Sequence, residues 1–304
     1  MPPPLILASN PSIGTLSAAS PVNLAFALLL GAIIGSFLNV VIVRLPQQGA
    51  SILRPRSHCN CGRPLAWYDI VPILSWFVLR GRARCCHAPI SFRYPLVEGA
   101  TALLFVLCAL RLPAPVVPCA WLFVSGLIAI AFIDAEHTII PDVLSLGLVV
   151  AGLVLSFFVP SLHGFGWIHF PSANIASGIS GLSGMLIGSS FILWVGIFCS
   201  AFARKEALGF GDVKLLGAIG AFCGWRGALF ASLGGAALGL ISFAIARFVL
   251  VPSRDPKDPA EAIVPGHISL PIGTALPFGP MLTAAATTYL LIPHAGFDRL
   301  LPSF

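Results

Sequence analysis

The chain has 304 residues, of which 57% are hydrophobic and only 9% are charged, and its formal net charge is +6 at pH 7. Soluble domains carry about 25% charged residues, so this composition excludes an ordinary soluble globular protein and indicates a membrane protein. The basic residues form no stretch interleaved with aromatic residues, and we therefore expect no nucleic-acid partner.

Apolar stretches recur along the chain at lengths suited to crossing a bilayer. About 20 consecutive apolar residues span the hydrocarbon core. The predicted membrane helices cover residues 22–43, 96–111, 115–135, 142–161, 175–202, 208–224, 227–250 and 273–292. The expected fold is therefore all-α and polytopic, with about eight transmembrane helices and a small cytoplasmic insert that contains cysteines.

The distribution of lysine and arginine predicts the orientation, because cytoplasmic loops carry an excess of these residues. With the amino terminus outside, 13 of the 17 lie in inside loops, Lys214 lies just within the inner end of a helix, and only Arg111, Arg226 and Arg299 lie outside. No Lys or Arg precedes the first apolar stretch, so we interpret that stretch as a spanning helix and not as a cleaved signal peptide. We divide the chain into an outer terminus with the first helix (1–45), a cytoplasmic Cys/His loop (46–94) and a membrane core (95–304).

Two acidic positions interrupt the apolar sequence and are the strongest functional candidates. Asp134 ends the stretch at 115–135, and Asp212 closes the Gly-Phe-Gly-Asp run at 209–212. An ionised carboxylate in the hydrocarbon region costs about 2.5–3.5 kcal/mol on insertion scales, so such a residue is a functional-site candidate. The predicted topology places both carboxylates at the cytoplasmic side, where they can meet in space.

Two carboxylates in one site suit the hydrolysis of a peptide bond. They cannot both ionise at low cost, so the pair holds one proton between them. The ionised member can act as general base on a water molecule while the protonated member polarises the scissile carbonyl. Gly209 and Gly211 fit this chemistry, because glycine permits backbone conformations closed to other residues and leaves room for a substrate strand. We therefore predict aspartyl chemistry carried by Asp134 and Asp212.

Each of these acids also has a purely structural interpretation. Asp134 is alternatively a helix-end residue that faces water, and Asp212 is alternatively a helix cap or the ion-pair partner of Lys214. Asp142 follows Pro141 at a predicted helix start, where its carboxylate satisfies free N–H groups or supports the active site.

The remaining polar residues near the predicted site have simpler expectations. Glu98 is expected to cap the second helix, and Glu136 and Glu206 are expected to be solvated in interfacial loops. His137 either touches the site or has no catalytic role.

The insert carries a second chemical signal, with four thiols and two imidazoles in a window of 30 residues (58–87). In a reducing cytoplasmic loop such a group suggests a structural zinc site and not disulfides. The predicted ligands are His58, Cys61, Cys85 and Cys86, although the adjacent pair Cys85 and Cys86 is poorly placed to bind one ion. The alternative is a loop of reduced, unliganded thiols. The other cysteines outside the insert are interpreted as packing residues: Cys108, Cys119, Cys199 and Cys223.

Several motifs follow one another in a fixed order on this topology. They are Gly-Ser-Phe-Leu-Asn-Val-Val at 35–41 with Arg-Leu-Pro at 44–46, the Cys loop leading to Pro72, Arg-Tyr-Pro-Leu-Val-Glu at 93–98, Ile-Asp-Ala-Glu-His at 133–137 with Ile-Pro-Asp at 140–142, Gly-Phe-Gly-Asp at 209–212 with Lys-Leu-Leu at 214–216, and Pro-Phe-Gly-Pro at 277–280. The chain thereby resembles the prepilin leader peptidases, membrane aspartyl proteases of the GxGD kind that process type IV pilins and pseudopilins. The resemblance covers nearly the whole chain.

The resemblance implies that Asp134 and Asp212 are the catalytic pair of a multi-pass protein in the bacterial cytoplasmic (inner) membrane, embedded in membrane lipid. Members cut a short basic leader from prepilins or pseudopilins of type IV pili or type II secretion at the cytoplasmic face. Many members then methylate the new amino terminus with S-adenosylmethionine. No residue is assigned to that cofactor, because no glycine-rich nucleotide loop occurs in the sequence.

The sequence departs from the family pattern in the Cys loop, where longer members carry two Cys-x-x-Cys pairs. His58 and Cys61 align with the first pair, but only Cys86 aligns with a ligand of the second, so Cys85 or His87 would have to replace the missing one. Whether zinc binds is therefore left open by the sequence.

Three other functions remain as alternatives. The first is a peptidase without methyltransferase activity, since the methyltransferase is implied only by the resemblance and no motif for its cofactor is identified. An ion-coupled transporter also has buried acids and glycine-broken helices, but it predicts inverted repeats with polar breaks near the midplane, which the sequence does not show. An inactive assembly subunit would be expected to lack one of the two aspartates, and both are present.

Overall fold

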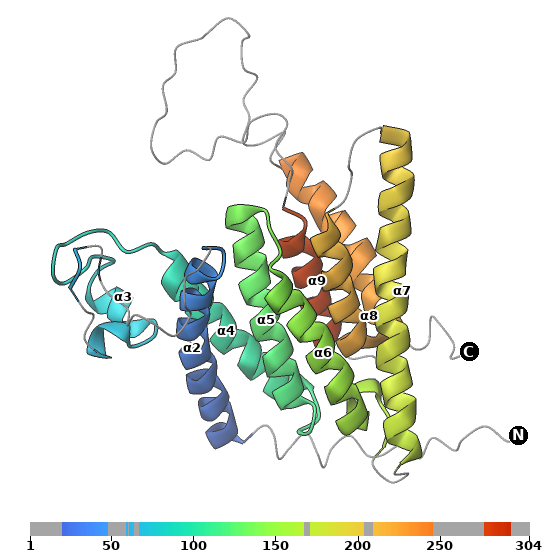
Figure 1. Cartoon of the computed structure of the whole chain (residues 1–304). Coiled ribbons are helices and arrows are strands. Elements are labelled where there is room, and N and C mark those ends of the chain that lie inside the picture. Colours follow the sequence, from blue (N-terminus) through green and yellow to red (C-terminus); the bar gives the residue numbers. More distant parts are fainter. Residues whose placement is uncertain are drawn as a thin grey trace, which may run out of the picture.

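The computed structural model describes residues 20–47, 59, 61–63, 67–166, 171–203, 209–245 and 277–292. Over these ranges the regular structure is helical, and the only strand-like pairing is an isolated bridge between Arg82 and Pro89. The bundle in Figure 1 consists of α2 (Pro21–Arg44), α4 (Arg93–Arg111), α5 (Val117–His137), α6 (Asp142–Phe158), α7 (Ser172–Ala203), α8 (Phe210–Ile245) and α9 (Gly279–Leu291). Short elements complete the fold, with the 3-10 turn η1 (Trp67–Ile70) and α3 (Leu74–Val78) between α2 and α4, and the 3-10 turn η2 (Pro160–His163) after α6.

Five of these helices are long and apolar enough to cross a membrane, namely α2, α4, α5, α7 and α8. Two others are shorter, since α6 has 17 residues and α9 has 13. The predicted all-α polytopic fold is confirmed, and the protein is a membrane protein. The eight predicted stretches correspond to α2, α4, α5, α6, α7, the two halves of α8, and α9, although residues 273–276 of the last stretch lie outside the described ranges.

Local sequence explains how the first spanning helix begins. The side chain of Ser20 accepts a hydrogen bond from the backbone N–H of Asn23 (3.2 Å), and Pro21 occupies the first helical position. Proline suits that position, because it lacks an N–H that the helix could not pair anyway. The helix then ends at Arg44, directly before Leu45 and Pro46.

α8 reverses its direction at Gly224. A straight helix of its 36 residues would be about 54 Å long, well beyond the roughly 30 Å thickness of the hydrocarbon core. Gly224 has φ 69° and ψ 179°, which is not a helical conformation and which glycine adopts without a steric cost. The helix is therefore two helical halves joined at Gly224, as the gap between the predicted stretches 208–224 and 227–250 indicated.

Contacts on either side of Gly224 show that the halves lie side by side. A Cβ atom built on Gly188 of α7 would meet both the Leu216 carbonyl (2.8 Å) and the Ala228 side chain (2.9 Å), one from each half. The second half runs antiparallel to α9, because Gly227 approaches Tyr289 whereas Gly235 approaches Leu282. Both ends of α8 thus lie at the same end of the bundle, and Figure 1 shows the ribbon of α8 doubling back.

α7 and the first half of α8 cross at two glycines. A Cβ atom on Gly184 would lie 2.2 Å from the Gly220 carbonyl oxygen, and one on Gly220 would lie 2.1 Å from the Gly184 carbonyl oxygen. The backbones therefore touch directly, which is the close approach that small residues allow between helices in a membrane. No side chain can be added at this crossing without separating the two helices.

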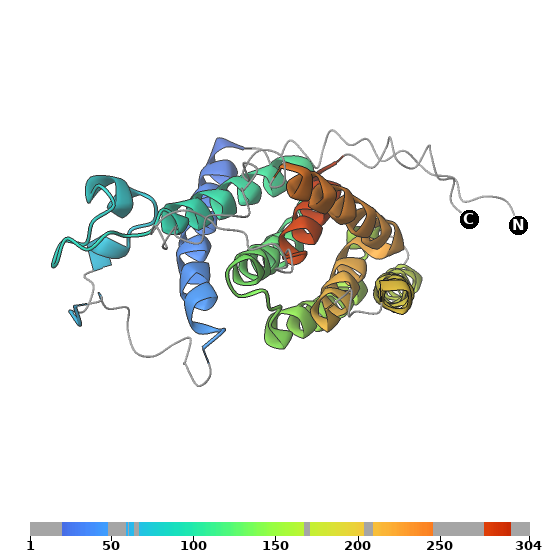
Figure 2. The ribbon, with the colours of Figure 1, turned by 90° about the horizontal axis from the view of Figure 1, so that it is seen from above.

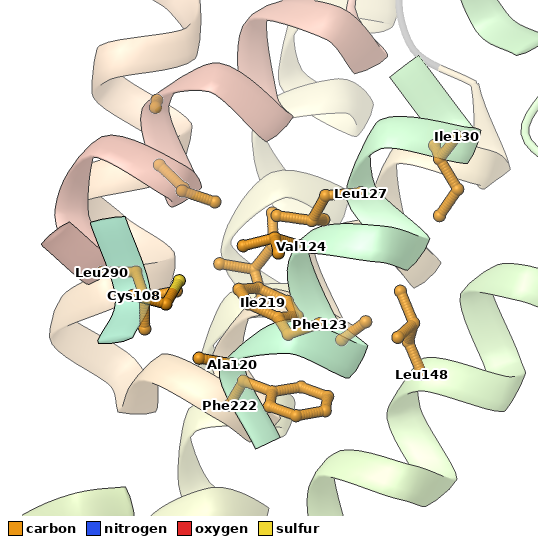
Figure 3. Close-up of a cluster of buried hydrophobic side chains, with 14 of the residues drawn as sticks. Cys108, Ala120, Phe123, Val124, Leu127, Ile130, Leu148, Ile219, Phe222 and Leu290 are labelled. Carbon is orange, nitrogen blue, oxygen red and sulfur yellow. The ribbon is translucent and has the colours of Figure 1, made fainter. Parts of the chain in front are cut away.

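α5 lies at the centre of the bundle. Figure 2 shows it beside α2, α4, α6 and α9, while α7 stands outside α8. In its most apolar 18-residue window 67% of the residues are buried, against 17% in the corresponding window of α7. Figure 3 shows Phe123 and Leu127 of α5 near Ile219 and Phe222 of α8, where the rings of Phe123 and Phe222 stack with centroids 4.5 Å apart. Leu148 of α6 and Leu290 of α9 belong to the same apolar core.

We predict that Gly184→Ala destabilises the protein although alanine is the better helix former. The added methyl group forces the backbones of α7 and α8 apart, and overpacking of this kind costs about 1–3 kcal/mol. Gly147→Ala in α6 is the matched control, because a Cβ atom there has no neighbour within 4 Å. Thermal unfolding of the detergent-solubilised variants measures the difference, and equal midpoints for the two would contradict the crossing.

Candidate active site

Asp134 lies in the last turn of α5 and is buried, with 5% of its surface exposed. α5 ends just beyond it, at Thr138, which adopts a left-handed conformation (φ 53°) and donates its N–H to the Asp134 carbonyl (2.8 Å). The end of the helix thereby fixes the position of Asp134 at one end of the bundle, which we call the carboxylate end.

Asp212 lies in the first turn of α8 and is likewise buried, with 9% exposed. Its backbone N–H donates to the Gly209 carbonyl (3.1 Å), which closes the first turn of the helix. Its side chain is close enough to Asp134 for the two carboxylates to interact electrostatically. The two aspartates, 78 positions apart in the sequence (134 to 212), are therefore both buried at the carboxylate end, within reach of each other's charge.

A backbone group from a third helix completes the contact with Asp134. The N–H of Gly279, the first residue of α9, donates to Asp134 Oδ2 (2.9 Å). The N-terminus of a helix carries partial positive charge, so it stabilises a carboxylate placed there. A Cβ atom on Gly279 would lie 2.7 Å from the same oxygen, so only glycine fits. Sequence reasoning identified the Pro-Phe-Gly-Pro motif at 277–280 but missed this backbone donor.

The ion pairs around the site differ from those expected. Lys214 pairs with Asp142 at the start of α6 (2.6 Å) and not with Asp212. Glu136 is exposed, as expected of a solvated residue, but it lies in the last turn of α5 and not in a loop, and it pairs with Arg93 (2.5 Å). These pairs join α8 to α6 and α5 to α4 at the carboxylate end.

Glu98 also differs from its expected role. It lies in the second turn of α4, is 7% exposed, and accepts a hydrogen bond from the backbone N–H of Ile73 (2.7 Å), so it does not cap its own helix. His137 is exposed, and Glu206 lies outside the described residues.

Neither glycine of the Gly-x-Gly-Asp run adopts an unusual backbone conformation, and only Gly211 is required by a close approach. Neither Gly209 nor Gly211 has a positive φ. A Cβ atom on Gly211 would meet the Ile140 side chain at 2.9 Å, so this glycine lets the start of α8 approach the loop between α5 and α6. A Cβ atom on Gly209 would lie 3.6 Å from Asp212 Oδ2, an ordinary contact distance.

Four cysteines of the insert form a compact group, with their sulfur atoms all within 4.8 Å of one another. Cys59 Sγ lies 3.4 Å from Cys86 Sγ, and Cys61 Sγ lies 3.3 Å from Cys85 Sγ. A tetrahedral zinc site with Zn–S bonds of about 2.3 Å separates its sulfurs by about 3.8 Å, so the group fits this metal. The hydrogen bond from the Cys61 backbone, and then those from the Cys85 and Cys86 thiols, lower the pKa of Cys59 to about 7.

This group changes the predicted ligand set. Cys61, Cys85 and Cys86 lie together as predicted, and the adjacent pair does converge on one point. The fourth sulfur comes from Cys59, which sequence reasoning passed over because the Cys-x-Cys spacing is irregular. His58 lies outside the described residues. Among the other cysteines, Cys108 and Cys119 are buried as packing residues, Cys223 is half-buried, and Cys199 is exposed, against expectation.

A helical membrane bundle with two carboxylates meeting at one end is the arrangement expected of a membrane aspartyl peptidase. Residues 29–112 match the bacterial peptidase A24 N-terminal domain, and residues 121–244 match the type IV leader peptidase family. The chain therefore belongs to the type IV leader peptidase family.

Several curated relatives share one name. A prepilin leader peptidase/N-methyltransferase of Myxococcus xanthus is 42% identical over 73% of this chain, but the match spans only 63% of that protein's length. Proteins of the same name from Klebsiella pneumoniae and Aeromonas hydrophila are 40% and 34% identical over 66% and 86% of this chain, and the matches span 86% and 88% of their lengths. No solved structure matches the chain significantly.

We predict that Gly279→Ala lowers the leader-peptidase activity by about 10²-fold, the loss that a displacement of about 1 Å causes at a catalytic group. The added Cβ atom pushes the Asp134 carboxylate away from α9. Gly99→Ala in α4 is the control, since a Cβ atom there meets nothing within 4 Å. Cleavage assays on both variants, normalised to folded protein, make the comparison, and parent-like activity of Gly279→Ala would refute the assigned contact.

Proposed function

We propose that this protein cleaves the leader peptide of type IV prepilins or pseudopilins by aspartyl chemistry. The observation that carries the proposal is the meeting of Asp134 and Asp212, two buried carboxylates on different helices, at one end of a membrane bundle. Membership in the leader peptidase family and the printed name of the relatives support the substrate class.

The contacts suggest a division of labour between the two carboxylates. A hydrogen bond to a carboxylate favours its ionised form, and Asp134 accepts one from the Gly279 N–H. We therefore assign to Asp134 the role of general base, which takes a proton from the attacking water. Asp212 then holds the proton shared by the pair and donates a hydrogen bond to the scissile carbonyl, which stabilises the oxyanion that develops there.

The proposed orientation places the carboxylate end at the cytoplasmic face of the bacterial inner membrane, with the amino terminus outside. Lysines and arginines concentrate in the loops that this orientation puts inside. A peptide bond just outside the hydrocarbon region, between a basic leader and an apolar helix, would then lie at the level of the two aspartates.

The relatives' name also supports a second activity, the methylation of the new amino terminus with S-adenosylmethionine as methyl donor. The cofactor would supply the activated methyl group. No residue of this chain is assigned to it, and the peptidase proposal does not depend on it.

The four-cysteine group supports a structural zinc ion held by Cys59, Cys61, Cys85 and Cys86. Four thiolates form a closed coordination shell, which suits a structural ion and leaves no position for a substrate. The ion would tie the start of the insert to the segment just before α4.

We expect Asp134→Asn and Asp212→Asn each to abolish leader cleavage, because neither variant retains two carboxylates that share a proton. Proteoliposomes with the parent protein or one of the variants are incubated with a prepilin, and mass spectrometry reads the new amino terminus and any added methyl group. Asp142→Asn is the matched control, since Asp142 lies at the same end of the bundle but pairs with Lys214. Substantial cleavage by either catalytic variant removes that residue from the pair, and no cleavage by the parent refutes the peptidase.

Removal of one thiol tests the metal site separately. Cys59→Ser is expected to lose the bound zinc, whereas Cys199→Ser on α7 is expected to retain it. Atomic emission of the purified proteins measures the zinc content per chain. A parent protein without zinc, or a Cys59→Ser protein with full occupancy, would contradict the assigned ligands.

A further inference from the structure

The insert exposes large apolar side chains that the bundle does not cover. Leu74, Phe77 and Val78 of α3 are 64%, 59% and 73% exposed, and Phe92 is 59% exposed. Residues three and four positions apart share a helix face, so the three residues of α3 point to one side. Trp76 packs edge-on against both Phe77 and Phe92, with ring centroids 5.3 and 5.5 Å apart. We call Leu74, Phe77, Val78 and Phe92 the α3 patch; a grouping of this kind marks an interaction surface.

The α3 patch belongs to a part of the chain that lies beside the bundle and not over its end. Figures 1 and 2, which view the molecule from perpendicular directions, both show the insert extending sideways from α2 and α4. In a membrane this lateral space is occupied by lipid. An apolar surface that projects into this space is therefore expected to contact lipid and not a soluble protein.

One hydrogen bond fixes where α3 lies along α4. The backbone N–H of Ile73, directly before α3, donates to the Glu98 side chain (2.7 Å). Glu98 is five residues beyond Arg93, the first residue of α4, so the contact lies about 7.5 Å inside the start of that spanning helix. α3 therefore begins beside the first turns of α4, at the end of that helix where the expected topology has the chain enter the bilayer.

The charges near the patch suit a lipid surface. Arg80 and Arg82 directly follow α3 and are exposed, whereas Arg84 pairs with Asp69 (3.0 Å) and lies over the Tyr68 ring (5.0 Å). Residues 67–92 therefore contain one acidic residue and three arginines, which gives this segment a net positive charge. Basic and aromatic side chains beside an apolar face are typical of helices that lie in the membrane interface, and arginines there attract anionic headgroups.

We propose that the α3 patch is embedded in the bilayer leaflet at the carboxylate end, where it anchors the insert against anionic phospholipid. The apolar side chains of α3 and Phe92 enter the boundary between headgroups and acyl chains, and Arg80 and Arg82 contact the phosphates. The bond between Glu98 and Ile73 ties this anchor to α4. The insert is then held at a fixed height beside the active site, and this holds whether or not the peptidase proposal is correct.

The test measures depth in the full-length protein. A nitroxide is attached through a genetically encoded keto amino acid at position 77, and the protein is reconstituted in phosphatidylcholine vesicles with phosphatidylglycerol. Its relative accessibility to oxygen and to a water-soluble nickel chelate reports its depth. Leu103, an exposed residue of α4, serves as the lipid reference, and Arg63, an exposed residue of the insert, serves as the water reference.

The expected result is a position 77 that is shielded from nickel, about 5–10 Å below the phosphates and shallower than Leu103 near the middle of α4. A position 77 as accessible to nickel as Arg63 overturns the proposal. A photocrosslinker at the same position is expected to capture phospholipid, and capture of a second copy or of an added prepilin in its place would assign the patch to that partner.

The role of the arginines has its own control. The double variant Arg80→Gln/Arg82→Gln is expected to make position 77 shallower in vesicles with phosphatidylglycerol and to have no effect in phosphatidylcholine alone. Arg111→Gln, which removes one positive charge at the opposite end of α4, is the control for position and should leave the depth unchanged. Equal depth with and without the two arginines in anionic vesicles refutes the anionic contact.

Discussion

The contact between Gly184 and Gly220 is the constraint on which the geometry of the carboxylate end depends. Inside a bilayer, helices gain no hydrophobic stabilisation by leaving lipid for one another, so their association depends on close packing and polar contacts. The two glycines let α7 and α8 touch through their backbones. This contact sets the position of the first half of α8, and that half carries Asp212. The chemistry at one end of the bundle thus depends on the absence of side chains near its middle.

Apolar length and the cost of buried charge made the main features of this protein predictable from sequence. The stretches of apolar residues predicted the spanning helices, and the gap after residue 224 predicted the reversal that Gly224 makes. Asp134 and Asp212 were identifiable because a carboxylate in an apolar membrane segment is costly and therefore marks a functional site. Each of these signals lies within a short segment of the sequence, so it can be recognised from a single sequence.

The parts that sequence reasoning missed are contacts between distant segments. The donor to Asp134 is the backbone N–H of Gly279. Every residue except proline has such a group, so the sequence does not indicate which one is the donor. Lys214 was considered for the acid two positions away, but the folded chain offers it Asp142, 72 positions away. Glu98 was expected to serve its own helix, whereas it holds the insert through Ile73. Such partners are decided by packing, which periodicity and composition do not describe.

The N–H of Gly279 also has a consequence for the order in which the protein becomes competent. Asp134 and Asp212 are both synthesised before α9, the last helix that the structure describes. Until α9 enters the membrane, the Asp134 carboxylate lacks its helix-terminal donor, and the carboxylate end is open where α9 will stand. A growing chain therefore carries both acids without a finished site. Completion of the contact between Gly279 and Asp134 therefore coincides with insertion of α9.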